Sequence, residues 1–177
     1  MYNVNFWTGG ILLFIAVVWG IVLICKNIKE SKDISKKLLK SSMSFREGLN
    51  LTGFPVVTFT NNDRIFNFLL DTGSNVSLID ESVLPCMKYE EDESKMDLYG
   101  LDGIERTGKI VVSYLTYEEI SYKANFVVTN LGPTFTQIKN EHGVTLHGIL
   151  GSDFFKAYKY ILDFNKLIAY SKLIDKK

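Results

Sequence analysis

The feature that most constrains this 177-residue chain is a short polar turn enclosed by two apolar runs. Residues 68–79 read Phe-Leu-Leu-Asp-Thr-Gly-Ser-Asn-Val-Ser-Leu-Ile, and the tetrapeptide from Asp71 to Ser74 interrupts the apolar pattern. Short apolar runs bounded by Gly and small polar residues are typical of buried strands. The sequence therefore predicts a strand, a tight turn that carries Asp71, and a second strand. The Asp-Thr-Gly sequence occurs once in the chain.

A second segment, far downstream, has a related pattern. Residues 146–155 read Leu-His-Gly-Ile-Leu-Gly-Ser-Asp-Phe-Phe, so the apolar pair Ile149 and Leu150 ends at Gly151. A short amphipathic stretch follows. This pattern predicts a strand that leads into a helix.

These segments and their order resemble the retropepsin-like aspartic proteases, the family of retroviral proteases and their cellular and bacterial relatives. The resemblance covers about residues 51–172. It implies a mainly β fold, a retropepsin-like acid protease β-barrel with one short C-terminal helix. It also implies an aspartic endopeptidase that acts on a peptide or protein substrate and uses neither a cofactor nor a metal.

The resemblance also implies roles for individual residues. Asp71 would be the catalytic carboxylate, and the Ser74 hydroxyl would bond to its outer oxygen. The residues implied to support the active-site loop are Thr72, Gly73 and Ser74. Those implied to form a substrate-binding flap, at the tip of a hairpin over residues 99–108, are Tyr99, Gly100, Leu101, Asp102 and Gly103. Those implied to cross the catalytic loop are Ile149, Leu150 and Gly151.

One such turn supplies only half of a catalytic pair. Peptide hydrolysis needs a base that activates water and an acid that protonates the leaving group, and two aspartates that share a proton provide both. The resemblance therefore implies a homodimer in which each subunit contributes Asp71 across a two-fold axis. The simpler alternative is that Asp71 only caps a turn, which is a common role for Asp.

The N-terminal segment predicts a membrane anchor. Residues 6–25 carry no charge over twenty positions, which is enough for a helix to cross the roughly 30 Å hydrocarbon core. We therefore expect residues 1–25 to form a single-pass anchor that contacts lipid through residues 6–25. A cleaved signal peptide is the alternative, but residues 1–5 contain no Lys or Arg for the basic region that such a peptide needs.

Residues 26–50 are interpreted as a basic juxtamembrane linker. Residues 26–40 contain six lysines and two acidic residues, so the positive-inside rule predicts that this side is cytoplasmic. The alternative is an ordinary solvated lysine-rich face. Residues 41–50 are polar and contain Gly48, which predicts a flexible spacer.

Residues 51–177 are predicted to form the protease domain. From residue 45 onward the chain has 14 basic and 18 acidic residues, a balance that does not favour nucleic acid as a partner. The sequence predicts a hairpin of strands 54–60 and 64–70, a short helical turn at 80–84, strands at 109–115 and 120–128, and an irregular connection over 131–146.

Several other polar residues are interpreted as structural. His142 and His147 have no accompanying Ser or Cys nucleophile motif, so surface or packing roles are expected. Asp153 is expected near a helix start, where it favours the helix dipole, and Asp163 is expected to make a structural hydrogen bond. The two cysteines, Cys25 and Cys86, predict neither a disulfide framework nor a metal cluster.

Three functions remain open from the sequence. The first is a membrane-anchored homodimeric aspartic endopeptidase, with self-cleavage in the linker around Leu39 or residues 43–45. The second is a catalytically silent retropepsin-like module for dimerisation or peptide binding at the membrane. The third, a structural membrane protein with an incidental turn motif, explains neither the Ile149 to Gly151 segment nor the order of the elements.

Overall fold

The computed structural model describes residues 17, 19–26, 28–29, 43–99 and 105–173. The chain separates into two compact units, Met1–Ser41 and Ser42–Lys177. In the first unit residues 19–26 are helical. Most of the predicted anchor over residues 6–25 lies outside the described residues. Within the described part of the chain, no helix has both the length and the apolar character needed to span a bilayer.

The described part of the second unit is mainly β and contains three α-helices. Its helices are α2 (Phe45–Thr52), α3 (Gly132–His142), α4 (Ser152–Tyr158) and the 3-10 helix η1 (Glu81–Cys86). Its strands are β1 (Val56–Asn61), β2 (Arg64–Leu70), β3 (Ser77–Asp80), β4 (Tyr89–Tyr99), β5 (Glu105–Tyr117), β6 (Ile120–Thr129), β7 (Gly148–Leu150), β8 (Tyr160–Asp163) and β9 (Ile168–Ser171).

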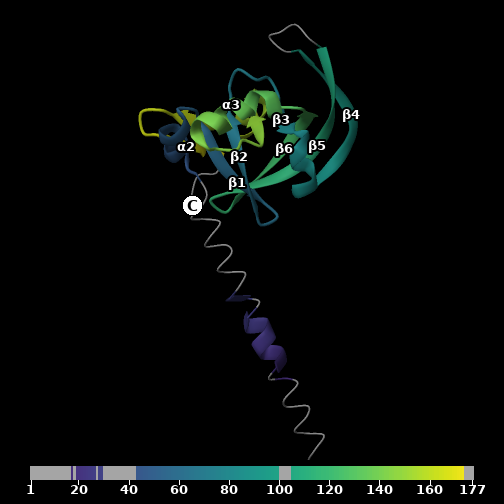
Figure 1. Cartoon of the computed structure of the whole chain (residues 1–177), viewed down its shortest axis with the longest axis vertical. Coiled ribbons are helices and arrows are strands. Elements are labelled where there is room, and N and C mark those ends of the chain that lie inside the picture. The colour runs from purple at the N-terminus through teal and green to yellow at the C-terminus, as the bar shows by residue number, and fades with distance from the viewer. Residues whose placement is uncertain (1–16, 18, 27, 30–42, 100–104, 174–177) are drawn as a thin grey trace, which may run out of the picture. The chain divides into compact units, whose positions relative to one another are not determined.

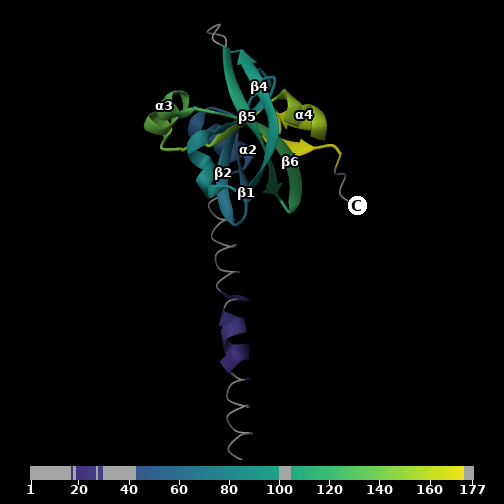
Figure 2. The same ribbon diagram turned by 90° about the vertical axis from the view of Figure 1, so that its right-hand side faces the viewer.

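Six strands close into a barrel, as expected. The sheet has the order β1-β2-β7-β3-β6-β5-β4, and β1 also pairs with β5 through Thr60 and Thr116. The pairs β2–β7 and β3–β6 are parallel, whereas β3–β7 is antiparallel. Strand β4 pairs with β5 outside this ring, and Figures 1 and 2 show these two long strands curving away from the rest of the barrel.

The predicted first hairpin is confirmed, and its turn explains its register. Asn62 and Asp63 both have positive φ, 48° and 61°, which is the backbone of a two-residue type I′ turn. The strands that flank it pair antiparallel from Val56 with Leu69 to Asn61 with Arg64. Asn and Asp tolerate this left-handed backbone better than most residues do.

The interior of the barrel is aromatic. Phe59, Phe68 and Phe126 are completely buried, and Tyr122 is 1% exposed. Phe59 lies edge-on to both Phe68 and Tyr122, and Phe68 stacks on Phe126. Full burial of one such side chain contributes about 1.5–3 kcal/mol, so these rings hold the strands of the barrel together.

The expectation of a flexible spacer over residues 41–50 is wrong for its last part, because residues 45–50 belong to α2. Ser44 and Glu47 form a capping box at the start of this helix, and Gly53 ends it in the left-handed conformation. Phe45 is buried against the core, and the main chain of Met43 bonds to Thr58 in β1. The residues from Met43 onward therefore belong to the folded part of the second unit, ahead of the domain start predicted at residue 51.

The expected irregular connection over residues 131–146 is also wrong, because it contains α3. Pro133 lies in the first turn of α3, and Gly143 ends it with a φ of 71°. Phe135 and Ile138 pack this helix onto a second small core with Val56 and Ile149. The domain thus has two α-helices, α2 and α3, beyond the one short C-terminal helix that was expected. That helix is α4.

Candidate active site

Asp71 lies at the end of β2, where the chain leaves the barrel. Leu70 pairs with Leu150 in the parallel β2–β7 ladder. The Asp71 N–H continues this ladder and donates to the Leu150 carbonyl over 3.0 Å. The side chain of Asp71 is half-buried, so its carboxylate is held by a fixed main chain and still reaches the surface.

The turn after Asp71 folds back on its carboxylate. The Gly73 N–H donates to Asp71 Oδ1 over 2.8 Å, and the Ser74 N–H donates to the Asp71 carbonyl over 3.3 Å. A Cβ at Gly73 would lie 3.1 Å from that same Oδ1 atom, so glycine leaves the space that the carboxylate occupies. Two main-chain donors thus fix the turn around Asp71.

The Ser74 hydroxyl does not take the role that the resemblance implied. It donates to the Val76 carbonyl over 2.6 Å instead of to the outer oxygen of Asp71. A serine two residues before a carbonyl readily makes this local bond, which competes with longer-range contacts. Ser74 therefore shapes the turn. Thr72 is exposed, and its carbonyl is held by the Ser152 hydroxyl over 2.8 Å.

The start of α4 packs directly onto this turn. The Ser152 N–H donates to the Ser74 carbonyl over 2.8 Å. Gly151 sits so close that an added Cβ would lie 2.4 Å from the Val76 carbonyl oxygen and 2.9 Å from that of Ser74. The structure thus brings Leu150 and Gly151 against the turn. Ile149 pairs with Leu69 and Leu78 on either side of β7.

A buried serine–aspartate contact beneath the turn was not predicted from the sequence. Ser77 is 1% exposed, and its hydroxyl donates to Asp153 Oδ1 over 2.8 Å and accepts from the Gly151 N–H over 3.0 Å. Asp153 lies in the first turn of α4, as expected, and also accepts from the Phe154 N–H. The sequence signal was available only as a Gly-Ser-Asp helix start, which does not reveal its partner in β3.

A cavity of about 500 Å³ opens beside Asp71. It extends from the turn to α4 and β8, and its polar wall is formed by Asp71 and Thr72. The residues that line it are Pro55, Leu70, Asp71, Thr72, Phe155, Tyr160, Leu162 and Phe164. An apolar cavity with few convergent polar groups is the usual form of a binding site.

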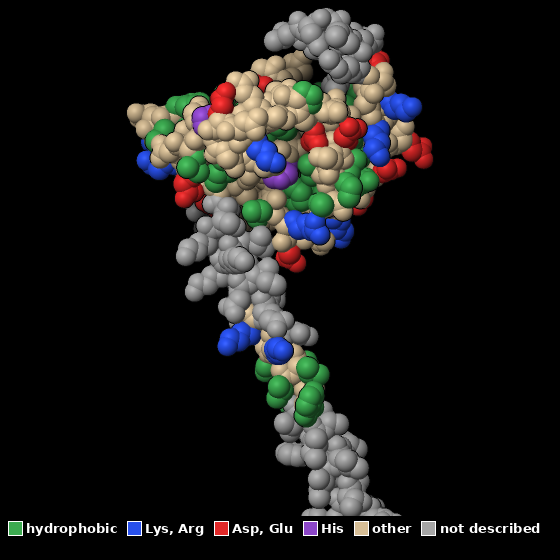
Figure 3. All heavy atoms as spheres, in the orientation of Figure 1, with side chains coloured by type: hydrophobic (Ala, Val, Ile, Leu, Met, Phe, Trp, Pro, Cys, Tyr) green, Lys and Arg blue, Asp and Glu red, His purple; other side chains and the backbone are tan. Residues whose placement is uncertain are grey.

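The hairpin at whose tip the flap was predicted is formed by β4 and β5. Tyr99 ends β4 and pairs with Glu105, the first residue of β5. Gly100, Leu101, Asp102 and Gly103 lie outside the described residues. The outer strand β4 is charged, and Figure 3 shows acidic and basic side chains gathered on the side of the domain that carries β4 and β5.

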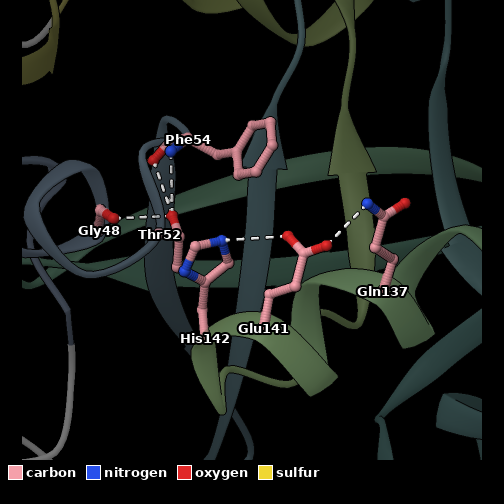
Figure 4. A network of polar contacts seen from close by, with 6 residues as sticks. All are labelled: Gly48, Thr52, Phe54, Gln137, Glu141 and His142. Carbon is pink, nitrogen blue, oxygen red and sulfur yellow. Dashed lines mark hydrogen bonds and ion pairs between the residues drawn. The ribbon is translucent and has the colours of Figure 1, made fainter.

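Neither histidine is near Asp71 in any described contact, in line with their expected packing roles. The His147 Nδ1 atom accepts the Asn67 N–H over 2.9 Å, and burial lowers the pKa of this imidazole. His142 ends α3, where its ring lies edge-on to Phe54 and its Nε2 atom is 3.7 Å from Glu141 Oε2 (Figure 4). Asp163 accepts main-chain N–H groups of Asn165 and Lys166, the structural role expected for it.

Comparison with known proteins extends these observations. Residues 57–154, more than half of the chain, match the family described as aspartyl protease. A search of curated proteins finds no match. Among solved structures, the chain is similar to EIAV protease complexed with the inhibitor HBY-793, at 20% identity and a TM-score of 0.47, over 65% of this chain and 97% of that one. It is also similar to the retroviral protease-like domain of Ddi1 from Leishmania major, at 14% identity and a TM-score of 0.43, over 66% of this chain and 84% of that one.

Proposed function

Because the chain belongs to the aspartyl protease family, we propose that it is an aspartic endopeptidase in which Asp71 is the catalytic carboxylate. The observation that carries the proposal is the placement of Asp71. Its carboxylate reaches the surface from a turn that main-chain hydrogen bonds hold, at the wall of a cavity. A carboxylate needed only for a turn would not require this opening.

Hydrolysis requires a second carboxylate, and the matched family segment contains one Asp-Thr-Gly turn. We infer that a second copy of the chain supplies its own Asp71 across a two-fold axis. Two carboxylates at contact distance share one proton, because two adjacent negative charges repel strongly. The ionised carboxylate takes a proton from water, whose oxygen attacks the peptide carbonyl carbon, and the protonated one donates to the carbonyl oxygen. The carboxyl group that took the proton from water then donates it to the nitrogen as the C–N bond breaks, and a hydroxyl of the tetrahedral intermediate returns its proton to the other carboxylate.

The β4–β5 hairpin is proposed to cover the substrate. Its two strands are long, and they pair without a break from Lys95 with Lys109 to Tyr99 with Glu105, next to the hairpin tip. This continuous pairing suits the hairpin to move as a unit when it closes over an extended peptide. The peptide would add main-chain hydrogen bonds to the enzyme, and its alternate side chains would enter apolar pockets. Residues 99–103 are the part of the hairpin proposed to contact the peptide.

We also propose that residues 6–25 anchor the enzyme in a membrane and that the domain lies on the cytoplasmic side. The support is the uncharged run and the lysines that follow it. Confinement to a membrane surface raises the local concentration of subunits and so favours the dimer. Activity would then rise with the amount of inserted protein.

If the enzyme releases itself from the anchor, the structure limits where the cut falls. Met43 bonds to Thr58 through its main chain, and Phe45 is 2% exposed. A bond between residues 43 and 45 would have to leave the fold before it could enter a neighbouring active site. A releasing cut is therefore proposed upstream of Met43, in the stretch that contains Leu39.

The proposal is tested with the full-length chain in detergent, incubated with a diverse peptide library at acidic and neutral pH and analysed by mass spectrometry. Asp71→Asn should abolish every cleavage. Asp63→Asn is the matched control, because Asp63 is exposed in a type I′ turn that Asn accepts equally well. Equal cleavage by Asp71→Asn would refute the catalytic role. A folded dimer without any cleavage would instead favour the silent binding module.

A further inference from the structure

His147 lies at the start of β7 and joins this short strand to β2 by two hydrogen bonds. Its N–H donates to the Asn67 carbonyl over 2.9 Å, and its Nδ1 atom accepts the Asn67 N–H over 2.9 Å. On the other side, its carbonyl accepts the Asp80 N–H of β3 over 3.0 Å. One half-buried residue thus connects β7 to both of its neighbouring strands.

The opposite end of β7 holds the main chain of Asp71. Strands β2 and β7 pair in parallel over three residues, and the last pair is Leu70 with Leu150. The Asp71 N–H then donates to the Leu150 carbonyl over 3.0 Å. Because the ladder is this short, the two bonds of His147 are a large part of what fixes its register. The register in turn fixes the position of Asp71.

Strand β7 has little room to shift between its neighbours. A Cβ on Gly148 would lie 2.5 Å from the Leu78 carbonyl oxygen and 2.8 Å from the Phe68 ring. The His147 ring lies edge-on to Phe66, at a centroid distance of 5.5 Å. Closely packed segments transmit displacements to their neighbours, so a change in the bonds of His147 acts along β7.

We propose that His147 is a positioning residue for Asp71, and that its neutral imidazole is the state that holds β7 in register. The inference rests on the proposed function, because it concerns the placement of the proposed catalytic carboxylate. Since Nδ1 accepts a hydrogen bond, the neutral ring carries its proton on Nε2. A proton added to Nδ1 would point at the Asn67 N–H, and two donors that face each other repel. Protonation therefore breaks the side-chain bond to β2.

The surroundings of the ring set the pH at which this happens. Burial lowers the pKa of His147, so the neutral ring persists below the usual histidine range near pH 6.5. Among the described residues, the charged group that acts on the ring is the Asp80 carboxylate of β3, which favours the protonated form. The contacts of the ring on β2, Phe66 and Asn67, are uncharged. Peptide cleavage should therefore be lost in acid as His147 becomes protonated.

The first measurement is a titration of the full-length Asp71→Asn variant in detergent, followed by NMR between about pH 7.5 and 4.5. This substitution removes the titration of the carboxylate at position 71. The His147 ring and the main-chain N–H resonances of residues 67 and 71 should shift with one common midpoint. In the double variant that also carries His147→Asn, residue 71 should lose this titration. The Asn side-chain oxygen takes the place of Nδ1 and accepts the Asn67 N–H without titrating.

The second measurement is kcat for peptide cleavage over the same pH range. In the unmodified chain kcat should fall about tenfold for each pH unit below the His147 midpoint, and His147→Asn should move this fall to lower pH. His147→Leu, which offers no acceptor, should lower kcat by about 10–100-fold at neutral pH with little change in KM. His142→Asn is the control, since the ring of His142 contacts Phe54 and Glu141.

The inference is overturned if residue 71 does not titrate with His147, or if its titration persists in His147→Asn. It is also overturned if kcat falls at the same pH in His147→Asn as in the unmodified chain. A common midpoint in a chain that cleaves no peptide would support the positioning role, while the protease proposal fails. Cleavage that requires Asp71, with a pH dependence that His147→Asn leaves unchanged, would support the protease proposal and refute this inference.

Discussion

The Ser77 hydroxyl and the Asp153 carboxylate, 76 residues apart in the sequence, are joined by a hydrogen bond of 2.8 Å. This bond connects the start of β3 to the first turn of α4, directly behind the turn that carries Asp71. Because Ser77 also accepts the Gly151 N–H, one buried hydroxyl organises two segments that both contact the turn. The position of Asp71 thus depends on residues that take no part in the proposed chemistry.

Ser77→Ala should destabilise the domain by about 1–3 kcal/mol, because it leaves the Gly151 N–H and an Asp153 oxygen without their buried partner. Urea denaturation measures the change. Ser94→Ala is the control, since Ser94 also bonds to an aspartate, Asp92, but at an exposed position in β4. Equal free energies of unfolding for the two variants would show that the Ser77 bond stabilises the domain no more than the exposed Ser94 bond does.

Gly151→Ala should destabilise the domain by about 1–3 kcal/mol, because it forces an extra methyl group into a closely packed site. The new Cβ would lie 2.4 Å from the Val76 carbonyl oxygen, a main-chain atom that cannot move without displacing the turn that carries Asp71. Thermal unfolding followed by circular dichroism provides the measurement. In Gly132→Ala the nearest atom is the Asn130 side-chain oxygen at 3.3 Å, so that variant should fold normally. A Gly151→Ala variant as stable as Gly132→Ala would contradict the close approach.

The turns of the fold could be predicted from the sequence, because a few neighbouring residues determine each of them. The Asp71 turn and the Asn62–Asp63 hairpin are set by residues with strong turn preferences between apolar runs, and both were placed correctly. Helix α2 was missed because its residues are mostly polar. Its capping signature, Ser44 with Glu47 three residues later, was present and was outweighed by the polar, Gly-containing composition.

The parts that were not predicted depend on contacts between distant residues. The parallel pairing of β2 with β7, the closure of β1 on β5, and the bond of Ser77 to Asp153 join segments more than 50 residues apart. No local pattern encodes such partners. The Ser74 hydroxyl was predicted to bond to the outer oxygen of Asp71. It bonds instead to the Val76 carbonyl within its own turn, so here a local contact replaced the expected one.

Acid should destabilise the domain through His147. Burial lowers the pKa of this imidazole in the folded protein, whereas in the unfolded chain it is about 6.5. The unfolded state therefore binds the proton first. The contribution to stability is fully present above about pH 6.5 and is lost as the pH falls from there toward the folded pKa, with a slope of at most about 1.4 kcal/mol per pH unit.

Urea denaturation between pH 7.5 and 5.5 measures this dependence, above the range in which ordinary carboxyl groups titrate. His147→Gln should flatten the curve in this interval. His142→Gln, which removes the imidazole at the end of α3, is the control. Retention of the full slope in His147→Gln would assign the acid sensitivity to another group.

Tyr160→Phe should leave the domain equally stable or raise its free energy of unfolding by up to about 1 kcal/mol. The Tyr160 hydroxyl is buried and has no hydrogen-bond partner within the described structure, so its removal avoids the cost of desolvating it. The ring, which packs against Phe154 at a centroid distance of 5.3 Å, is retained.

Tyr158→Phe is the contrasting variant, because the Tyr158 hydroxyl accepts the Lys123 N–H over 2.7 Å and donates to the Lys123 carbonyl over 2.8 Å. It should lose about 0.5–1.5 kcal/mol. Urea denaturation of both variants under the same conditions measures their free energies of unfolding. A larger loss of stability in Tyr160→Phe than in Tyr158→Phe would show that the buried Tyr160 hydroxyl has a partner such as an internal water.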